Sequence, residues 1–548
     1  MLIYPGERYG FYGAARIQCL AGDLVVDKFS MPSGGYLNFD SMYLVCAPFR
    51  LSRPALFQSP ATEMGTVKYK LNRLKYRLKE ITPHYERIME AVGERYPAVV
   101  VIDRKPSQTI RVLDQLVQDF FVPSTLRTSC QFDRTLFFKS DYEPYEEVSE
   151  NQLQEAMGRI NSKRKEGRRC IIVPVGCSGS GKSTLVRHIV NANLQQEASA
   201  IYLLDADVGQ AEFTPAGCMS LWKVLLPILD IPCTHQQLTY PCSYFFGNIS
   251  PADDTEKYKV IFDRLLNEFQ STSEPGSLLI INTMGWVDGL GCELLNHIFD
   301  VAQPHLALKL SADRGSFNIP SVVPDMVSVV RKFEPYQFQQ KLLDRHPKPT
   351  RLSSSQLRDL AVLAYFAPSL PRPILSSVCD AQPYRVQFKD VTVCVPDDYS
   401  YVDDRYFFAT LNVQIVALCS ELSDQPLEVR RILGDETLPN VSITHPGSPV
   451  LNCHGFGQLP RLIRAIDLGK KLFYFLTPLS LTELAKVTVF ARGTDILVPQ
   501  LLLECQPATN VPYLSRPALA SVSGIISDLY GGLRNVRHGR REYFPANN

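Results

Sequence analysis

The sequence lacks several features that would place it in a class at once. It has only two tryptophans, no C-x-x-C pair among its 14 cysteines, and no apolar run approaching the roughly 18 residues of a membrane-spanning helix. Its scattered cysteines predict reduced, mostly buried thiols and no structural zinc site. The first ten residues lack the apolar segment of a secretory signal. We therefore expect an intracellular protein that is not embedded in a membrane.

Charge of one sign is not in excess either. Lysine and arginine number 57 against 56 acidic residues, so the formal net charge of +1 does not indicate a polyanionic partner. The length of 548 residues, at roughly 150 residues per domain, predicts more than one folded unit. We expect three domains, over residues 1–150, 151–368 and 369–548.

The first domain combines strands with a basic helical region. Apolar segments between glycines in residues 9–27 are typical of short antiparallel strands. Apolar residues then recur every three or four positions through residues 71–92, which predicts a helix that Pro83 should kink. Lysines and arginines in residues 68–79, with Tyr69 and Tyr76 among them, form the other face of this helix. They are equally consistent with an RNA-binding surface and with a solvated helix face.

The central region has the pattern of an α/β domain. A polar helical segment over residues 147–169 leads into a β-branched run, residues 170–175, of the kind that parallel sheets bury. Three further apolar runs, separated by stretches long enough for crossover helices, follow at residues 200–204, 277–281 and 306–310. This pattern predicts a doubly wound, mainly parallel sheet. Prolines over residues 368–384 mark a linker, and the short apolar segments after it predict a β-rich C-terminal domain.

One motif indicates the chemistry of the central domain. Residues 176–183 match G-x-x-x-x-G-K-S/T between a predicted strand and a predicted helix, as a phosphate-binding P-loop requires. Backbone N–H groups of such a loop surround a β-phosphate, its lysine reaches the β- and γ-phosphates, and its serine hydroxyl ligates Mg²⁺. The fold class is therefore α/β, with a central P-loop NTPase domain between an N-terminal, partly β domain and a C-terminal β-rich domain. The expected ATP-binding residues, with Lys182 also catalytic and Ser183 also a metal ligand, are Gly176, Cys177, Ser178, Gly179, Ser180, Gly181, Lys182, Ser183 and Thr184.

Two carboxylates follow the next predicted strand. Asp205 and Asp207 lie at its C-terminal end, where open α/β sheets place their chemistry. A carboxylate beside a P-loop can bind Mg²⁺ or accept a proton from an attacking hydroxyl. We favour Asp207 for both roles and a structural role for Asp205, while a structural role for both stays open. No N-K-x-D segment is present to read guanine, so ATP is the expected nucleotide.

Several segments together resemble the polynucleotide 5′-hydroxyl kinases related to the pre-mRNA cleavage-complex subunit, and most closely their nucleolar branch in ribosomal RNA processing. The resemblance rests on residues 205–210 and 282–286 beside the P-loop. Residues 5–13, 212–217 and 473–478 also resemble that branch. The similarity spans most of the chain and is weakest over residues 60–130.

The resemblance implies transfer of the ATP γ-phosphoryl group to the 5′-hydroxyl of RNA, or DNA, ends, with Mg²⁺ as cofactor. It implies that Asp207 activates the hydroxyl and that Trp286 stacks on a terminal base, although a core aromatic is the alternative for Trp286. Gln210 and Ser250 would contact substrate, but Ile249 stands where related kinases have a hydroxyl residue, which weakens the assignment of Ser250. A lid arginine is expected within residues 341–366, where we rank Arg358 above Arg345 and Arg351.

The resemblance also implies partners and a location. It predicts a hetero-oligomer with the endoribonuclease that cuts the second internal transcribed spacer of pre-rRNA, and residence in the nucleus and nucleolus. Basic segments at residues 163–169 and 534–541 are candidate nuclear addresses or RNA contacts. Two alternatives stay open: an ATP-binding scaffold of an RNA-processing complex without phosphotransfer, and an ATPase acting on a small-molecule hydroxyl.

Overall fold

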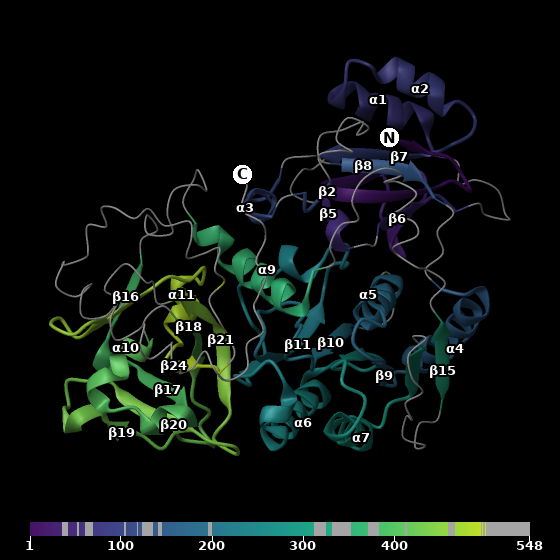
Figure 1. Ribbon diagram of the computed structural model, residues 1–548. Helices are drawn as coiled ribbons and strands as arrows, with labels where there is room; N and C mark the ends of the chain where they lie inside the picture. The colour runs from purple at the N-terminus through teal and green to yellow at the C-terminus, as the bar shows by residue number, and fades with distance from the viewer. Residues whose placement is uncertain are drawn as a thin grey trace.

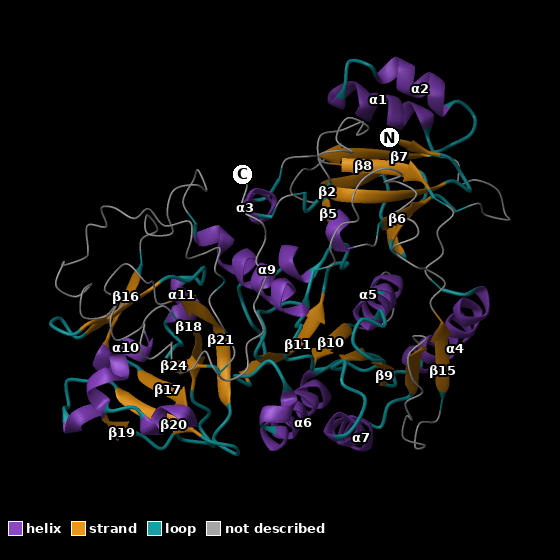
Figure 2. Cartoon of the chain, in the orientation of Figure 1, coloured by secondary structure: helices purple, strands orange, loops and turns teal. Residues whose placement is uncertain are grey.

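Three β regions with flanking helices make up the protein (Figures 1 and 2). The computed structural model describes residues 1–34, 42–51, 54–60, 69–103, 106–117, 119–122, 135–140, 145–194, 200–311, 325–330, 352–370, 383–411, 414–458, 466–494, 496 and 499. No helix in this part of the chain combines the length and the apolar character needed to cross a bilayer.

The N-terminal region is an antiparallel sheet built around one long strand, β2 (Arg8–Ala21), which pairs with four other strands. The predicted antiparallel strands are present and β3 (Leu24–Val26) lies within the expected range, but the segments expected over residues 9–20 form one long strand, because the glycines do not interrupt β2. Gly10 instead makes room for an aromatic neighbour, since an added Cβ would lie 2.2 Å from the Phe138 ring. The other strands are β1 (Leu2–Ile3), β3 (Leu24–Val26), β4 (Phe29–Met31), β5 (Tyr43–Ala47), β6 (Ala55–Gln58), β7 (Ala98–Asp103) and β8 (Thr135–Lys139).

Two helices, α1 (Leu71–Ile81) and α2 (Tyr85–Val92), lie against this sheet (Figure 1). Their apolar residues pack together as the periodicity predicted, but the expected single kinked helix is wrong. The chain leaves α1 in an extended conformation at Thr82, one residue before Pro83, where a helical conformation is disfavoured. Arg77, one of the basic residues, is buried and donates to the Leu20 carbonyl oxygen at 3.0 Å. A third helix, α3 (Gln108–Leu116), follows β7.

The central region is the predicted doubly wound α/β unit. Its five parallel strands run in the order β10 (Ile201–Asp205), β13 (Leu278–Asn282), β9 (Cys170–Val175), β14 (Leu306–Ser311) and β15 (Met326–Val330). One face packs on α5 (Lys182–Asn193), and the other packs on α6 (Thr255–Thr272) and α7 (Leu290–Ala302) (Figure 1). A polar helix, α4 (Glu147–Lys165), lies beside β15.

The C-terminal region continues the central sheet. Antiparallel strands β11 (Cys218–Val224) and β12 (Ser243–Phe245) extend it from β10, and β12 pairs with β21 (Leu451–Gln458). One 13-stranded sheet therefore crosses the predicted linker, and the domain boundaries stay a prediction. The remaining C-terminal elements are β16 (Tyr384–Gln387), β17 (Thr392–Pro396), α10 (Phe407–Leu411), β18 (Ile415–Ser420), β19 (Arg430–Arg431), β20 (Asn440–Thr444), β22 (Ile466–Asp467), β23 (Leu472–Phe475), α11 (Leu481–Leu484) and β24 (Val489–Arg492).

The N-terminal sheet meets the central region through a tight hairpin. Asp27 and Lys28, which connect β3 to β4, both have positive φ, as two-residue hairpin turns require. Lys28 pairs with Glu150 of α4 at 2.6 Å, and the Asp27 carbonyl oxygen accepts a hydrogen bond from Asn191 of α5 at 3.1 Å. The hairpin thus joins the N-terminal sheet to the helix that begins at the P-loop.

Candidate active site

The P-loop connects β9 to α5 with a shape that leaves space for an anion. Gly179 and Gly181 have φ of 76° and 99°, values that side chains disfavour. The Ser178 N–H donates to the Gly285 carbonyl oxygen at 3.0 Å, and a Cβ on Gly285 would lie 2.9 Å from the Ser178 backbone. The Ser180 hydroxyl is buried with no hydrogen-bond partner among the described residues. An unsatisfied buried donor in a glycine-rich loop at a helix N-terminus fits a phosphate.

Lys182, the first residue of α5, is buried in the same place. Its Nζ atom is 3.5 Å from the Gly176 carbonyl oxygen, a contact at the limit of hydrogen bonding. Burial lowers the pKa of Lys182, while the nearby charges of Asp207, Cys177 and Asp205 act in the opposite direction. A buried ammonium with one weak acceptor is costly unless an anion accompanies it. Lys182 is therefore placed to bind the phosphate that the loop would hold.

Asp205 and Asp207 occupy different environments at the end of β10. Asp205 is buried and accepts hydrogen bonds from the Glu212 N–H at 2.6 Å and the Asn282 side chain at 2.9 Å. Burial raises its pKa to about 7 against the effect of these bonds. Asp207 is half-buried, and its Oδ1 accepts the N–H groups of Gly209 at 3.1 Å and Gln210 at 3.0 Å. Its Oδ2 accepts no hydrogen bond within the described part of the chain, so it can serve a ligand.

A cavity of about 240 Å³ opens beside the start of α5. It brings together Ser183 and Thr184 of the P-loop helix, Gln210 after the Asp207 turn, and Arg358 of α9 (Ser354–Phe366). Gln210 also donates to the Ser354 hydroxyl at 2.9 Å, so α9 is fixed to the Asp207 turn at its first residue. The N-terminal region supplies another part of the wall, through Asp27, Cys46, Ala47, Pro48, Pro54 and Ala55.

Trp286 follows a residue that contacts the P-loop, and Ser250 follows a residue that approaches the Asp207 turn. Trp286 is half-buried and directly follows Gly285, the residue that touches Ser178; its ring covers Gly291. Ser250 begins a short 3-10 helix, Pro251–Asp253, and its hydroxyl accepts the Ala252 N–H at 3.3 Å. The carbonyl oxygen of Ile249, just before it, closely approaches Gly209 in the Asp207 turn. Trp286 and Ser250 are therefore each one residue away from a backbone contact with the P-loop or with the Asp207 turn.

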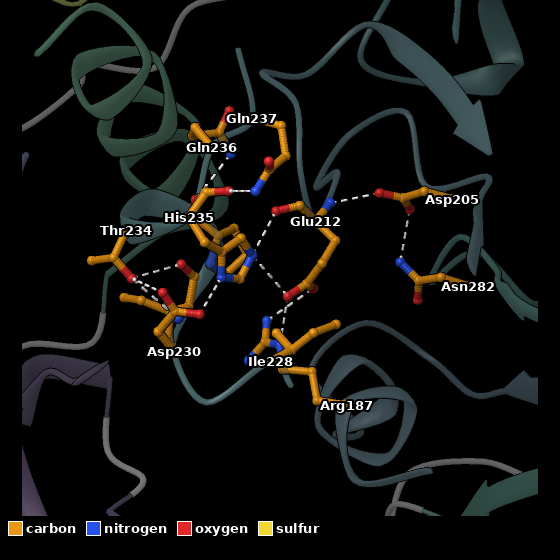
Figure 3. Close-up of polar contacts among 12 residues, drawn as sticks. Arg187, Asp205, Glu212, Ile228, Asp230, Thr234, His235, Gln236, Gln237 and Asn282 are labelled. Atoms are coloured by element: carbon orange, nitrogen blue, oxygen red, sulfur yellow. Dashed lines mark hydrogen bonds and ion pairs between the residues drawn. The ribbon is translucent and has the colours of Figure 1, made fainter. Parts of the chain in front are cut away.

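A buried ionic cluster adjoins this site (Figure 3). Arg187 of α5 binds both carboxylate oxygens of Glu212, at 2.6 and 3.0 Å. His235 lies 3.2 Å from the same carboxylate and 2.5 Å from that of Asp230. Burial would raise the pKa of Glu212, but Arg187 and His235 bring it to about 2. Burial would lower the pKa of His235, but Asp230 and Glu212 raise it to about 9.

Neither this cluster nor the N-terminal part of the cavity wall was predicted from the sequence. The one available signal was the spacing of Arg187, four residues after Ser183 and hence on the same face of α5.

The other basic residues singled out in the sequence either have structural partners or lie outside the described part of the chain. Arg164 and Arg169 donate to backbone carbonyl oxygens of Gly276 and Ser273, which is a structural role. Arg345, Arg351, Lys68 and residues 534–541 lie outside the described residues.

The chain is similar to one group of known proteins. The family model described as "mRNA cleavage and polyadenylation factor CLP1 P-loop" matches residues 176–368. The polynucleotide 5′-hydroxyl-kinase nol-9 of Caenorhabditis elegans is 35% identical over 515 residues, which cover 94% of this chain and 91% of the relative. NOL9 of Mus musculus, with the same descriptive name, is 26% identical over 626 residues, covering 100% and 78%. A Clp1p chain solved at its interface with Pcf11p covers 90% of this chain and 97% of its own, with 12% identity and a TM-score of 0.49.

Proposed function

The chain belongs to the NOL9 family of polynucleotide 5′-hydroxyl kinases, and from this premise we propose that it transfers the γ-phosphoryl group of ATP to the 5′-hydroxyl of an RNA end. The observation that carries the proposal is the position of Lys182. This buried ammonium lies at the P-loop beside Asp207, with the unpaired Ser180 hydroxyl in the same loop. Together they provide a phosphate site next to a carboxylate that can accept a proton.

The chain's own groups divide the reaction between them. The loop amides and Lys182 hold the β- and γ-phosphates and offset the charge that spreads over the transferring group. Asp207 takes the proton from the attacking 5′-hydroxyl through Oδ2, because its Oδ1 is occupied by two backbone N–H groups. Arg358, on the wall of the same cavity, supplies a second cation toward the phosphates.

A metal ion fits the donors present. Mg²⁺ in such sites is held by one or two protein oxygens together with substrate phosphates. Ser183 and Asp207 are the residues that would hold it, and the bound ion would neutralise charge on the β- and γ-phosphate oxygens. The described residues include no group of three or more His, Cys, Asp or Glu side chains placed to hold a metal ion.

ATP and the polynucleotide end would occupy different parts of the site. The cavity beside Thr184 and Arg358 is of a size to receive the nucleoside part of ATP between α5 and the N-terminal sheet. Trp286 follows the residue that contacts the P-loop, so a terminal base stacked on it would place its 5′-hydroxyl near the phosphates. Gln210 and Ser250, on the loops beside Asp207, are the proposed contacts to the strand end.

The biological setting is proposed from the family. Its members are named for a polynucleotide substrate, and the nucleolar branch suggests pre-rRNA spacer processing in the nucleolus. A partner endoribonuclease would generate the 5′-hydroxyl that this chain phosphorylates. The neutral total charge does not oppose RNA binding, because a strand end in a cleft needs only local positive potential.

Transfer of label from γ-labelled ATP to a 5′-hydroxyl oligonucleotide tests the proposal. Wild type should label the oligonucleotide, and Asp207→Ala should reduce the rate by ~10²–10⁴-fold while still binding ATP. Asp300→Ala, which changes an exposed aspartate of α7, is the matched control and should retain the wild-type rate. Absence of labelling by wild type, alone and with its endonuclease, would refute the kinase. Retained complex assembly in that case would favour the ATP-binding scaffold.

A further inference from the structure

We propose that Glu212 is a positioning residue, which fixes the turn carrying Asp207 to the face of α5 that presents Ser183. The effect on catalysis rests on the proposed function, whereas the effect on the turn does not. Glu212 follows the turn directly and is buried between α5 and the segment after β11 (Figure 3). No part of the P-loop motif includes it.

All three polar groups of Glu212 are held by different elements. Its N–H donates to the carboxylate of Asp205, at the end of β10, at 2.6 Å. Its carbonyl oxygen is 2.9 Å from Nε2 of His235. Its carboxylate accepts hydrogen bonds from Nε and Nη2 of Arg187 in a forked contact. Glu212 therefore joins the strand end, the segment after β11 and the P-loop helix at a single residue.

The helical spacing of α5 links this contact to the phosphate site. Ser183 and Arg187 are four residues apart, so they occupy the same face one turn from each other. In a forked arginine–carboxylate contact, two parallel hydrogen bonds fix the relative orientation of the two side chains as well as their separation. The Arg187–Glu212 pair thus sets where the Ser183 face lies relative to the turn that starts at Asp207.

The turn itself depends on short contacts that a shift would break. The N–H groups of Gly209 and Gln210 both donate to Asp207 Oδ1, and the Gln210 side chain reaches Ser354 of α9. The segment between Asp207 and Glu212 is only a few residues long. Movement at Glu212 is therefore transmitted to the carboxylate that would receive the proton.

The composition of the cluster indicates that it fixes the position of Glu212 rather than adding to the stability of the fold. It contains two cations, Arg187 and His235, and two anions, Glu212 and Asp230, all at most 12% exposed in their side chains. Burying ion pairs is expensive, and apolar residues of similar size often stabilise a protein as well or better. The forked Arg187–Glu212 contact and the two His235 contacts instead hold Glu212 in one position, which matters where a small displacement would slow the reaction.

Hydrogen–deuterium exchange on the free, full-length protein tests the claim without reference to activity. Glu212→Gln keeps the side-chain shape and removes the charge, so the amides of Gly209 and Gln210 should exchange at least ~10-fold faster than in wild type. Arg187→Lys keeps the charge and removes the fork, and it should give the same change to a smaller extent. Glu274→Gln, which breaks an exposed pair with Lys223, is the matched control and should leave these amides unchanged.

Kinetics give the second measurement. Because misplacement of reacting groups acts on the chemical step, Glu212→Gln should lower kcat by ~10–100-fold and leave the KM for ATP within about threefold. Unchanged exchange at Gly209 and Gln210 would overturn the proposal even if stability fell. An equal loss of kcat/KM through KM alone would also overturn it. A wild type without activity would refute the proposed function, while the exchange result would still decide the role of Glu212.

Discussion

Replacing His235 by glutamine should remove a pH dependence of stability that this histidine creates. Both ring nitrogens of His235 face oxygen acceptors, at Asp230 and at Glu212. A neutral imidazole has one N–H group, whereas the imidazolium has two, so only the charged form satisfies both contacts. The folded state therefore holds the proton more tightly than the unfolded chain does.

The magnitude follows from the two pKa values. The pKa of His235 is about 9 in the folded protein, against an ordinary value of 6.5. This difference corresponds to about 3 kcal/mol at 1.36 kcal/mol per pKa unit. Because the folded pKa is the higher one, the stabilisation is fully present below pH 6.5 and is lost as the pH rises through 9.

Chemical denaturation followed by tryptophan fluorescence can measure this loss. The two tryptophans, Trp222 and Trp286, both lie in the central region, and Trp222 packs on Phe213, which also contacts the His235 ring. Between pH 6 and 9.5, the unfolding free energy of wild type should fall by about 3 kcal/mol more than that of His235→Gln. His297→Gln, at a more exposed histidine of α7, controls for the substitution itself.

Parallel pH profiles for wild type and His235→Gln would refute this reasoning. They would mean that the proton is not bound more tightly in the folded state, and hence that the cluster is not charged as its geometry indicates. A wild type that gained stability as the pH rose through this window would contradict the sign of the argument.

Two further expectations concern the P-loop and the substrate. Gly285→Ala should lower kcat/KM for ATP by ~10–100-fold, because its Cβ would lie 2.9 Å from the Ser178 backbone, whereas Gly158→Ala, with open space around it, should not. Equal rates for these two variants would contradict the packing argument. Trp286→Ala should raise the KM for a 5′-hydroxyl oligonucleotide by ~5–150-fold, equivalent to ~1–3 kcal/mol of stacking, and leave the KM for ATP unchanged. An unaltered KM for the oligonucleotide would favour the alternative that Trp286 is a core aromatic.

The parts of the fold that the sequence predicted are those that depend on local patterns. The run over residues 170–175 forms buried strand β9, and the strands at β10, β13 and β14 follow equally clear apolar runs. The prediction failed where tertiary context decides. Apolar segments between glycines were predicted as separate short strands but form the single strand β2, in which the neighbouring Phe138 ring requires a residue without a side chain at Gly10.

The candidate site was likewise predicted only where a local motif defines it. Residues 176–184 were identified because phosphate binding requires a fixed order of residue types. The partners Arg187, Glu212, Asp230 and His235 come from separate segments, and each looks like an ordinary surface charge in the sequence. Only the fold brings them together. The N-terminal wall of the cavity was unpredictable for the same reason, since Cys46 and Pro54 carry no motif.

The pairing of β12 with β21 has a mechanical consequence. Through this pairing, the strands of the central region and those of the C-terminal region form one continuous hydrogen-bonded sheet. A force applied to the far C-terminal strands is therefore carried by backbone hydrogen bonds between strands. Within this sheet the two regions are joined by two paired positions, Tyr244 with Asn452 and Phe245 with Leu451. In the described part of the chain, the N-terminal sheet is not paired with these strands and instead contacts the central region through the β3–β4 hairpin and through the Cys46 N–H, which donates to the Leu229 carbonyl oxygen at 3.1 Å.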